Sequence, residues 1–271
     1  MKRSRFFIFF AIIILFFSYG VIAKAKENKS ILCINNYNRQ VWDEGVTDKT
    51  YRIVPEKVVY LTFDDGPSVN NTSRILDILK EQGVKATFFV VGTRVESHPD
   101  IVRRMYTDNM SIAPHCNNHD YKMVYASKDS FFNDYYSCMT SIERVTKEKV
   151  KNFVRMPGGS TNTICKSDIM KDIKGELKEK NIYYIDWNVS SGDASSYRVP
   201  KDKIEENIMA YSKGWDTIVV LMHDAEAKTT TVDALPDIIK YFKDNGYSFR
   251  TLDDMSKIEL NKMIKFGIVN K

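Results

Sequence analysis

The chain has 271 residues, of which 43% are hydrophobic and 28% charged, and its formal net charge is +5. This length accommodates one domain of ordinary size with an adequate hydrophobic core. Four of the positive charges lie in the first 25 residues, and subtracting them leaves +1 for the remainder, so the charge does not indicate a nucleic-acid partner. The sequence contains no internal repeat or low-complexity stretch.

The N-terminal residues have the pattern of an export segment. Three basic residues among the first five precede an apolar stretch that runs from Phe6 to Ala23 with few polar residues. Ala23-Lys24-Ala25 offers a small-residue cleavage site, whereas the apolar core is near the lower limit for spanning a bilayer. Residues 1–25 are therefore expected to be either a signal peptide or an N-terminal membrane anchor. Both alternatives place the rest of the chain outside the cytoplasm, secreted to the cell wall or anchored at the membrane.

Residues 26–56 are polar and are expected to form a stalk that leads to the first strand. Beyond the stalk, hydrophobic runs predict strands near residues 57–63, 86–91, 110–113, 152–155, 182–187, 217–222 and 247–251. Helical patterns lie between them, for example at residues 73–82 and 127–147. Because strand and helix alternate roughly seven times, we expect an α/β fold with a parallel sheet or barrel.

The first predicted strand ends in two adjacent carboxylates, Asp64 and Asp65, followed by Gly66-Pro67. Two ionised carboxylates side by side repel one another unless a positive charge lies between or beside them. A metal ion would relieve this repulsion if one carboxylate bound it and the other stayed free for proton transfer. The alternative is an ordinary solvated Asp-Asp-Gly-Pro turn.

Two of the four histidines, His115 and His119, stand four residues apart after the third predicted strand. On a helical turn both imidazoles would face the same way. Together with the Asp65 carboxylate they would leave an open coordination position for water, as a catalytic zinc site requires. We therefore expect one divalent metal ion, Zn²⁺ by preference, with Co²⁺ or Ni²⁺ also possible because such sites follow metal availability. His98 precedes Pro99 at a predicted helix start and is read as structural.

Further polar clusters follow the later predicted strands. They are Arg155-Met156-Pro157-Gly158 after the fourth strand, Asp193 after the fifth, and Leu221 with His223 at the sixth. In α/β barrels the active site is built at the carboxyl ends of the strands. The recurrence of polar clusters at this position favours a functional site over a set of unrelated turns.

Taken together, these motifs resemble the polysaccharide deacetylase family, the NodB-homology domain of carbohydrate esterase family 4, from about Lys57 to about Asp254. The resemblance implies a distorted (β/α)7 barrel of the NodB-homology type. We place the catalytic domain at residues 57–260 and treat residues 261–271 as a C-terminal tail.

The resemblance also assigns roles to the residues. Asp64 would be the general base, and Arg155 would orient it and favour its ionised form. His223 would be the general acid, oriented and kept basic by Asp193. The metal ligands would be Asp65, His115 and His119.

Two further residues match positions that face the substrate in the family. The backbone amide of Gly158 would face the oxyanion, and Leu221 would line the acetyl pocket.

The chain departs from the family pattern at three positions. Cys116 replaces the Ser or Thr that usually follows the first histidine, Gly158 stands where relatives often carry Tyr, and Ala194 stands where they often carry Trp. The loss of two aromatic side chains predicts a wider groove, unless an aromatic wall is supplied from elsewhere. Cys116 as a metal ligand is a weaker alternative, and the four cysteines are expected to be free or buried thiols.

The sequence therefore predicts an exported, metal-dependent hydrolase that removes N-acetyl groups from amino sugars of a cell-wall polysaccharide, above all N-acetylglucosamine of peptidoglycan. Its partners would be the cell-wall glycan and, if the leader is uncleaved, the membrane; we expect a monomer that binds no nucleic acid. The alternatives are a deacetylase of chitooligosaccharides or of N-acetylmuramic acid, a catalytically silent glycan-binding wall protein, and a structural wall protein with an incidental metal.

Overall fold

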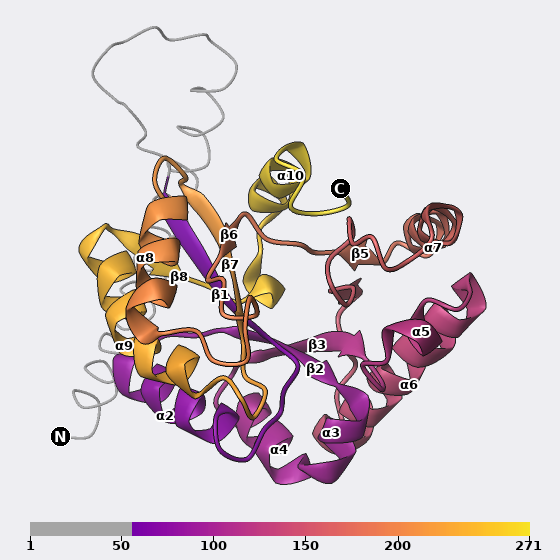
Figure 1. The fold of residues 1–271 in the computed structure, drawn as a ribbon, viewed down its shortest axis with the longest axis horizontal. Coiled ribbons are helices and arrows are strands. Elements are labelled where there is room, and N and C mark those ends of the chain that lie inside the picture. Colours follow the sequence, from indigo (N-terminus) through magenta and orange to yellow (C-terminus); the bar gives the residue numbers. More distant parts are fainter. Residues whose placement is uncertain (1–55) are drawn as a thin grey trace, which may run out of the picture. The chain divides into compact units, whose positions relative to one another are not determined.

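The computed structural model describes residues 56–271 (Figure 1). The leader expected at residues 1–25 lies outside these residues, as does the stalk expected at residues 26–56 apart from Glu56. Within the described part of the chain, no helix is both long enough and apolar enough to cross a membrane.

A parallel sheet forms the centre of the fold. Its strands lie in the order β3-β2-β1-β7-β6, and β8 pairs with the first residues of β1. The strand bounds are β1 Lys57–Asp64, β2 Thr87–Val91, β3 Ser111–Cys116, β6 Val189–Ser190, β7 Thr217–His223 and β8 Tyr247–Phe249. The central strand β1 is buried on both faces, as its continuous hydrophobic run predicts.

Two short strands continue the barrel beyond β3. They are β4 (Phe153–Val154) and β5 (Tyr183–Tyr184), which pair in parallel with each other. The Arg155 N–H donates to the Pro114 carbonyl at 3.3 Å, which joins the end of β4 to β3. The strands therefore follow one another around the barrel as β6-β7-β1-β2-β3-β4-β5, and within residues 56–271 β5 and β6 do not pair with each other. This arrangement confirms the expected distorted (β/α)7 barrel.

The C-terminal residues lie against the open edge at β5. Ile185 forms an antiparallel bridge with Val269, and the Asp186 N–H donates to the Ile268 carbonyl at 2.8 Å. An edge strand needs partners for its backbone groups, and this segment supplies them. The boundary expected at residue 260 was therefore wrong: it falls inside helix α10 (Lys257–Lys265), and residues 261–271 belong to the folded unit.

Helices cover the outside of the sheet (Figure 1). Successive contacts run α8, α9, α2, α4, α6 and α7, so the helices follow the order of the strands. The helix bounds are α2 Thr72–Gln82, α3 Gly92–Ser97, α4 Pro99–Thr107, α5 Tyr121–Val124, α6 Lys128–Thr146, α7 Ser167–Glu179, α8 Lys201–Tyr211, α9 Thr229–Asp244 and the 3₁₀ turn η1 Leu252–Asp254. The predicted helices at 73–82 and 127–147 correspond to α2 and α6.

Alternation along β1 decides which side chains reach the barrel interior. Val59, Leu61 and Phe63 belong to the core shared with the helices, whereas Val58 and Tyr60 belong to the core inside the barrel. Successive side chains of a strand point to opposite faces. Asp64 therefore lies on the same face of β1 as Tyr60. Its carboxylate reaches the inner side of the barrel at the carboxyl end of β1.

Candidate active site

The Asp64 carboxylate is held by a guanidinium that is completely buried. Arg155 Nη1 donates to Asp64 Oδ1 at 2.9 Å and to Thr62 Oγ1 at 2.6 Å. The other guanidinium nitrogens donate to the carbonyls of Ile185 and Asp186 at 2.9 and 3.0 Å. A buried charge is tolerated only when it is paired and hydrogen-bonded, and Arg155 meets both conditions. The carboxylate beside it is thus fixed in position next to a permanent positive charge.

Asp65, His115 and His119 form a cluster beside Asp64. One ligand atom from each of the three side chains lies within 4.8 Å of the other two. Asp65 Oδ1 is 3.4 Å from His115 Nε2 and 3.1 Å from His119 Nε2. Burial raises the pKa of Asp65, but the adjacent imidazoles outweigh it and hold this pKa well below its ordinary value.

The backbone that carries these three residues differs from the sequence prediction. His115 lies within β3, and His119 follows in a left-handed conformation with φ of +42°. The expected helical turn was therefore wrong: the chain turns sharply after the strand, and this turn brings His119 back beside His115. The backbone of Asp65 is also in the left-handed conformation, with φ of +77°. Strained backbone at non-glycine residues is characteristic of functional sites.

The donor set fits a divalent metal ion. Asp65 Oδ1 is buried and accepts no hydrogen bond from the described residues, so the atom is free to bind a cation. His115 Nδ1 lies 2.8 Å from the Arg155 carbonyl, which accepts a hydrogen bond from it and leaves Nε2 free as a ligand. One carboxylate and two imidazoles are the ligand set of catalytic zinc sites that keep open positions.

His223 and Asp193 form a second hydrogen-bonded pair. His223 Nδ1 lies 2.7 Å from Asp193 Oδ1, while the His223 N–H and Thr231 Oγ1 donate to Asp193 Oδ2 at 2.8 and 2.9 Å. Burial lowers the pKa of His223, but the hydrogen bond and charge of Asp193, together with other nearby carboxylates, raise it to about 9. The imidazole is therefore protonated at neutral pH. Asp193 follows β6, a strand that the sequence analysis missed, rather than β5.

The two proton-transfer groups are neighbours across a strand pair. Asp64 and His223 are register partners at the carboxyl ends of β1 and β7. Asp65 follows Asp64 directly, so the Asp65, His115 and His119 cluster lies beside this pair. The structure thus brings the carboxylate, the protonated imidazole and the ligand cluster to one end of the barrel.

Comparison with known proteins places the chain in a family. The sequence profile of the family described as polysaccharide deacetylase matches residues 51–173. A putative polysaccharide deacetylase of Bacillus subtilis, YheN, is 34% identical over 210 residues, which cover 76% of this chain and 71% of that protein. The chain belongs to the polysaccharide deacetylase family.

Relatives with named substrates are similar to this polysaccharide deacetylase in sequence and in fold. A peptidoglycan-N-acetylglucosamine deacetylase of Bacillus cereus is 32% identical over 199 residues, which cover 73% of this chain and 67% of that protein. The catalytic domain of peptidoglycan N-acetylglucosamine deacetylase from Eubacterium rectale has a crystal structure that matches with a TM-score of 0.69 at 33% identity. That match covers 74% of this chain and 90% of that domain.

Tyr121 is a site residue of this deacetylase that the sequence analysis missed. Its ring packs edge-on against His119 with centroids 5.2 Å apart. A Cβ atom built on Gly158 would lie 3.2 Å from Tyr121 Cε1. Tyr121 therefore places an aromatic ring beside Gly158, at the position where the sequence alone predicted an open groove. The available signal was an aromatic residue two positions after the second histidine, with Asp120 as the side-chain cap of α5.

The two positions expected to face the substrate lie at the same end of the barrel. Gly158 is exposed and left-handed, with φ of +74°, and its N–H donates to no acceptor in residues 56–271. Leu221 lies in β7 two residues before His223 and is almost completely buried. Cys116 is buried in a core that includes residues of α6 and α7 and is not one of the three clustered ligand residues, and among residues 56–271 it is a free thiol, like Cys138 and Cys165. Cys33 lies outside the described residues.

Asp224 is a second residue that the sequence analysis did not single out. It joins the loop after β1 to the end of β7. Its N–H donates to the Asp64 carbonyl at 3.1 Å, and its carbonyl accepts from Ser68 Oγ at 2.6 Å. Its carboxyl group accepts from Thr72 Oγ1 at 2.6 Å and fills the space beside Gly66. Burial is the main cause that raises the pKa of Asp224 to about 7. This buried link fixes the loop that carries Asp65.

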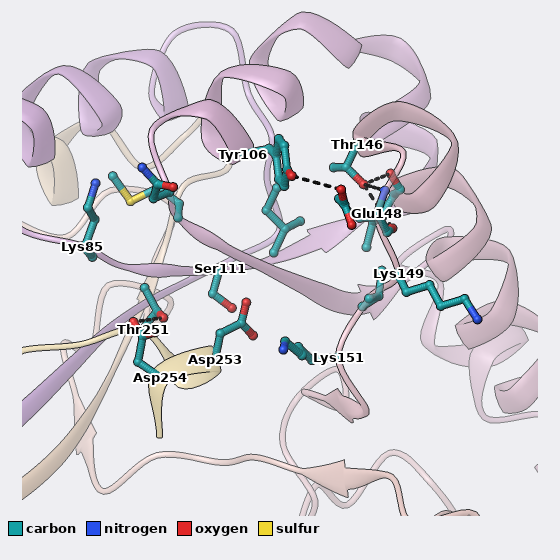
Figure 2. Close-up of a pocket in the computed structure, with 15 residues that line it drawn as sticks. Lys85, Tyr106, Ser111, Thr146, Glu148, Lys149, Lys151, Thr251, Asp253 and Asp254 are labelled. Carbon is teal, nitrogen blue, oxygen red and sulfur yellow. Dashed lines mark hydrogen bonds between the residues drawn. The ribbon is translucent and has the colours of Figure 1, made fainter. Parts of the chain in front are cut away.

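A hollow lies at the end of the barrel opposite the candidate active site (Figure 2). It has a volume of about 330 Å³ and includes Ser111, the first residue of β3, together with Lys85, Lys151 and Asp253. Because strand β3 begins here and carries His115 near its other end, this hollow is separated from the candidate active site by the length of the strand. It is therefore not part of the catalytic centre.

Proposed function

We propose that the protein is an exported, metal-dependent hydrolase that removes N-acetyl groups from amino sugars of a cell-wall polysaccharide, with N-acetylglucosamine of peptidoglycan as its substrate. The observation that carries this proposal is the register pairing of Asp64 with His223 beside the Asp65, His115 and His119 cluster. A proton acceptor and a proton donor stand next to each other at a site that can hold a Lewis acid. Metal-assisted amide hydrolysis uses all three.

Asp64 acts as the general base in this proposal. Its carboxylate takes a proton from the water that attacks the acetyl carbonyl carbon. Arg155 holds the carboxylate through the 2.9 Å contact and compensates its negative charge, so Asp64 is correctly aimed before the substrate arrives. Asp64 is not needed as a ligand, because the neighbouring Asp65 supplies the carboxylate of the cluster.

Asp65, His115 and His119 would hold one divalent ion, with Zn²⁺ as our first choice and Co²⁺ or Ni²⁺ as alternatives. When bound, such an ion would polarise the acetyl carbonyl and lower the pKa of a coordinated water. The hydrogen bond between His115 Nδ1 and the Arg155 carbonyl fixes which ring nitrogen is available. Arg155 thus orients the base through its side chain and one ligand through its backbone.

His223 acts as the general acid. An amine is a poor leaving group unless its nitrogen is protonated as the C–N bond breaks, and His223 carries the proton that this step needs. Its pKa of about 9 keeps the imidazole charged at neutral pH, and Asp193 holds the ring in place through Nδ1. The opposite nitrogen, Nε2, is then the atom that donates the proton.

The remaining residues bind the reacting group. The free N–H of Gly158 would donate to the oxyanion that forms on the acetyl oxygen, a position at which a preorganised donor contributes most. Leu221 would line the pocket for the acetyl methyl group. The Tyr121 ring would form one wall of the groove beside His119.

The substrate assignment rests on relatives and on the N-terminal sequence. Proteins named for N-acetylglucosamine and for N-acetylmuramic acid both match the chain. An export leader at residues 1–25 would place residues 57–271 where peptidoglycan is within reach, either in the wall or at the membrane surface. We propose that the protein acts there as a monomer.

Acetate release from two substrates tests the proposal. The purified full-length protein, loaded with Zn²⁺, would be incubated separately with peptidoglycan and with chitopentaose, and acetate would be measured enzymatically. We expect acetate from peptidoglycan, with new free amines on glucosamine rather than on muramic acid, and slower release from chitopentaose. Brisk release from chitopentaose alone would contradict the peptidoglycan assignment. No acetate from either substrate would favour a silent glycan-binding protein.

A further inference from the structure

A hollow of about 660 Å³ lies on the segment between β4 and α7 and on the first half of α7. None of the steps above uses it. Its lining residues are Ser160, Thr161, Asn162, Thr163, Cys165, Lys166, Ser167, Met170, Lys171 and Lys174, which we call the lysine pocket.

The lining of the lysine pocket carries only positive charge. It contains three lysines and no Asp or Glu, while the other polar members are hydroxyl and amide side chains. Lys166 and Lys171 make no ion pair or side-chain hydrogen bond to any residue between 56 and 271, so their charges are available to a ligand. Lys174 is less available to a ligand, because its Nζ donates a hydrogen bond to the Lys271 carbonyl at 2.9 Å.

The amino end of helix α7 adds to this charge. Ser167, Met170, Lys171 and Lys174 recur at the spacing of one helix face, so they line the pocket together. The N-cap residue is Lys166, whose side chain has no acceptor and makes no cap hydrogen bond, so the first N–H groups of α7 are left without a side-chain partner. Asp168 is in the first turn but does not line the hollow.

The lysine pocket is connected to the ligand cluster through three consecutive contacts. A Cβ atom on Gly158 would lie 3.2 Å from Asn162 Cβ and 3.2 Å from Tyr121 Cε1. Tyr121 in turn packs against His119, with ring centroids 5.2 Å apart. Asn162, a lining residue of the pocket, is therefore separated from a proposed metal ligand only by Gly158 and the Tyr121 ring. A glycan chain that extends from the catalytic centre past Tyr121 and Gly158 would bring a neighbouring sugar to this pocket.

We propose that the lysine pocket is a subsite for a carboxylate carried by the sugar next to the reacting one. This inference rests on the proposed function. In peptidoglycan every second sugar bears a lactyl group that ends either in a free carboxylate or in a peptide stem with its own carboxylates, whereas chitin chains are uncharged. Ammonium groups, hydroxyl donors and uncapped helix N–H groups all favour an anion. The pocket thus gives the enzyme a means to select peptidoglycan over chitin.

The test compares the double variant Lys166→Gln/Lys171→Gln with the wild-type protein on three tetrasaccharides. These are chitotetraose, a peptidoglycan tetrasaccharide with free lactyl carboxylates, and the same tetrasaccharide with peptide stems. We expect the KM for a carboxylate substrate, divided by the KM for chitotetraose, to rise about 3- to 10-fold in the double variant, since two exposed charge pairs are lost. The larger rise identifies which carboxylate the pocket binds. The wild-type ratio should also increase with salt.

The matched control is Lys213→Gln, which removes an exposed lysine that precedes β7 at the other end of the barrel. This control should leave the KM ratio at the wild-type value. Equilibrium binding by calorimetry, in an Asp64→Asn background, measures the same preference without turnover, so the subsite and the proposed chemistry can fail separately. Equal affinities of the double variant and the control for the carboxylate tetrasaccharides would overturn the subsite, even if the wild-type protein releases acetate.

Discussion

Arg155 connects the two halves of the candidate chemistry. Its guanidinium binds the Asp64 carboxylate, and its carbonyl accepts a hydrogen bond from His115. The sequence placed Arg155 near Asp64 only through a family resemblance, because the two residues are 91 positions apart. The spacing of His115 and His119 did indicate that they lie together, but the reason given, a shared helical turn, was wrong. Local spacing cannot show a turn that a strand end and a left-handed residue create.

Asp193→Asn should move the basic limb of the pH profile of kcat/KM to lower pH. The Asp193 carboxylate raises the pKa of His223, and the amide would remove this effect, so His223 would lose its proton at lower pH. Because the acid must be protonated to act, activity would be lost about 1–2 pH units earlier. Thr231→Val is the control, since it removes a hydrogen bond to Asp193 but no charge. An unchanged basic limb in Asp193→Asn would mean that His223 is not the acid.

Tyr121→Ala should lower kcat/KM about 10-fold or more while the metal content stays at one ion per chain. The ring forms the groove wall beside His119, and its loss would leave the substrate poorly oriented. Tyr121→Phe keeps the ring and should stay within about 3-fold of the wild type. Wild-type kinetics in Tyr121→Ala would show that the groove is open at this position, as the sequence alone suggested.

At the scale of elements, each of the seven predicted strands overlaps an observed strand, including the two-residue strands β4 and β5, and among the described residues only β6 was not predicted. The predicted strands at 57–63 and 217–222 correspond to β1 and β7, and Gly83 ends α2 in a left-handed conformation. Strand β6 has only two residues, too few for any alternation to be visible. The sequence could not show that residues 261–271 pack against β5, because that contact joins segments far apart in the chain.

Gly66→Ala should destabilise the protein and weaken metal binding. A Cβ atom there would lie 2.1 Å from Asp224 Oδ2, inside a buried hydrogen-bonded link, so the loop that carries Asp65 would have to shift. We expect a loss of about 1–3 kcal/mol in the free energy of unfolding, measured by denaturant titration.

Gly175→Ala is the control for this substitution. No atom lies within 4 Å of the added methyl group in helix α7, so stability should rise by up to about 1 kcal/mol. If both variants were equally stable, the link between Asp224 and the loop would not restrain the site.

At the scale of the whole molecule, the barrel explains why residues from distant parts of the sequence share one site. Asp64, His115, Asp193 and His223 all lie at or just after the carboxyl ends of parallel strands, and these ends meet on one side of the barrel. This principle made the site predictable before any contact was known. It does not specify the neighbours that adapt the site to a substrate, such as Tyr121 and the lysine pocket, because they depend on how loops pack against one another.

The measurement that tests the proposed chemistry most directly combines metal content and acetate release in three forms of the full-length protein. Elemental analysis would give the bound divalent metal per chain, and acetate would be measured on peptidoglycan with the same samples. We predict that the wild type binds one ion and releases acetate. Asp65→Ala should lose both, whereas Asp64→Asn should keep the ion and lose turnover by about 100-fold or more. Full metal content in Asp65→Ala, or near-normal turnover in Asp64→Asn, would contradict the proposed division of roles between the two adjacent carboxylates.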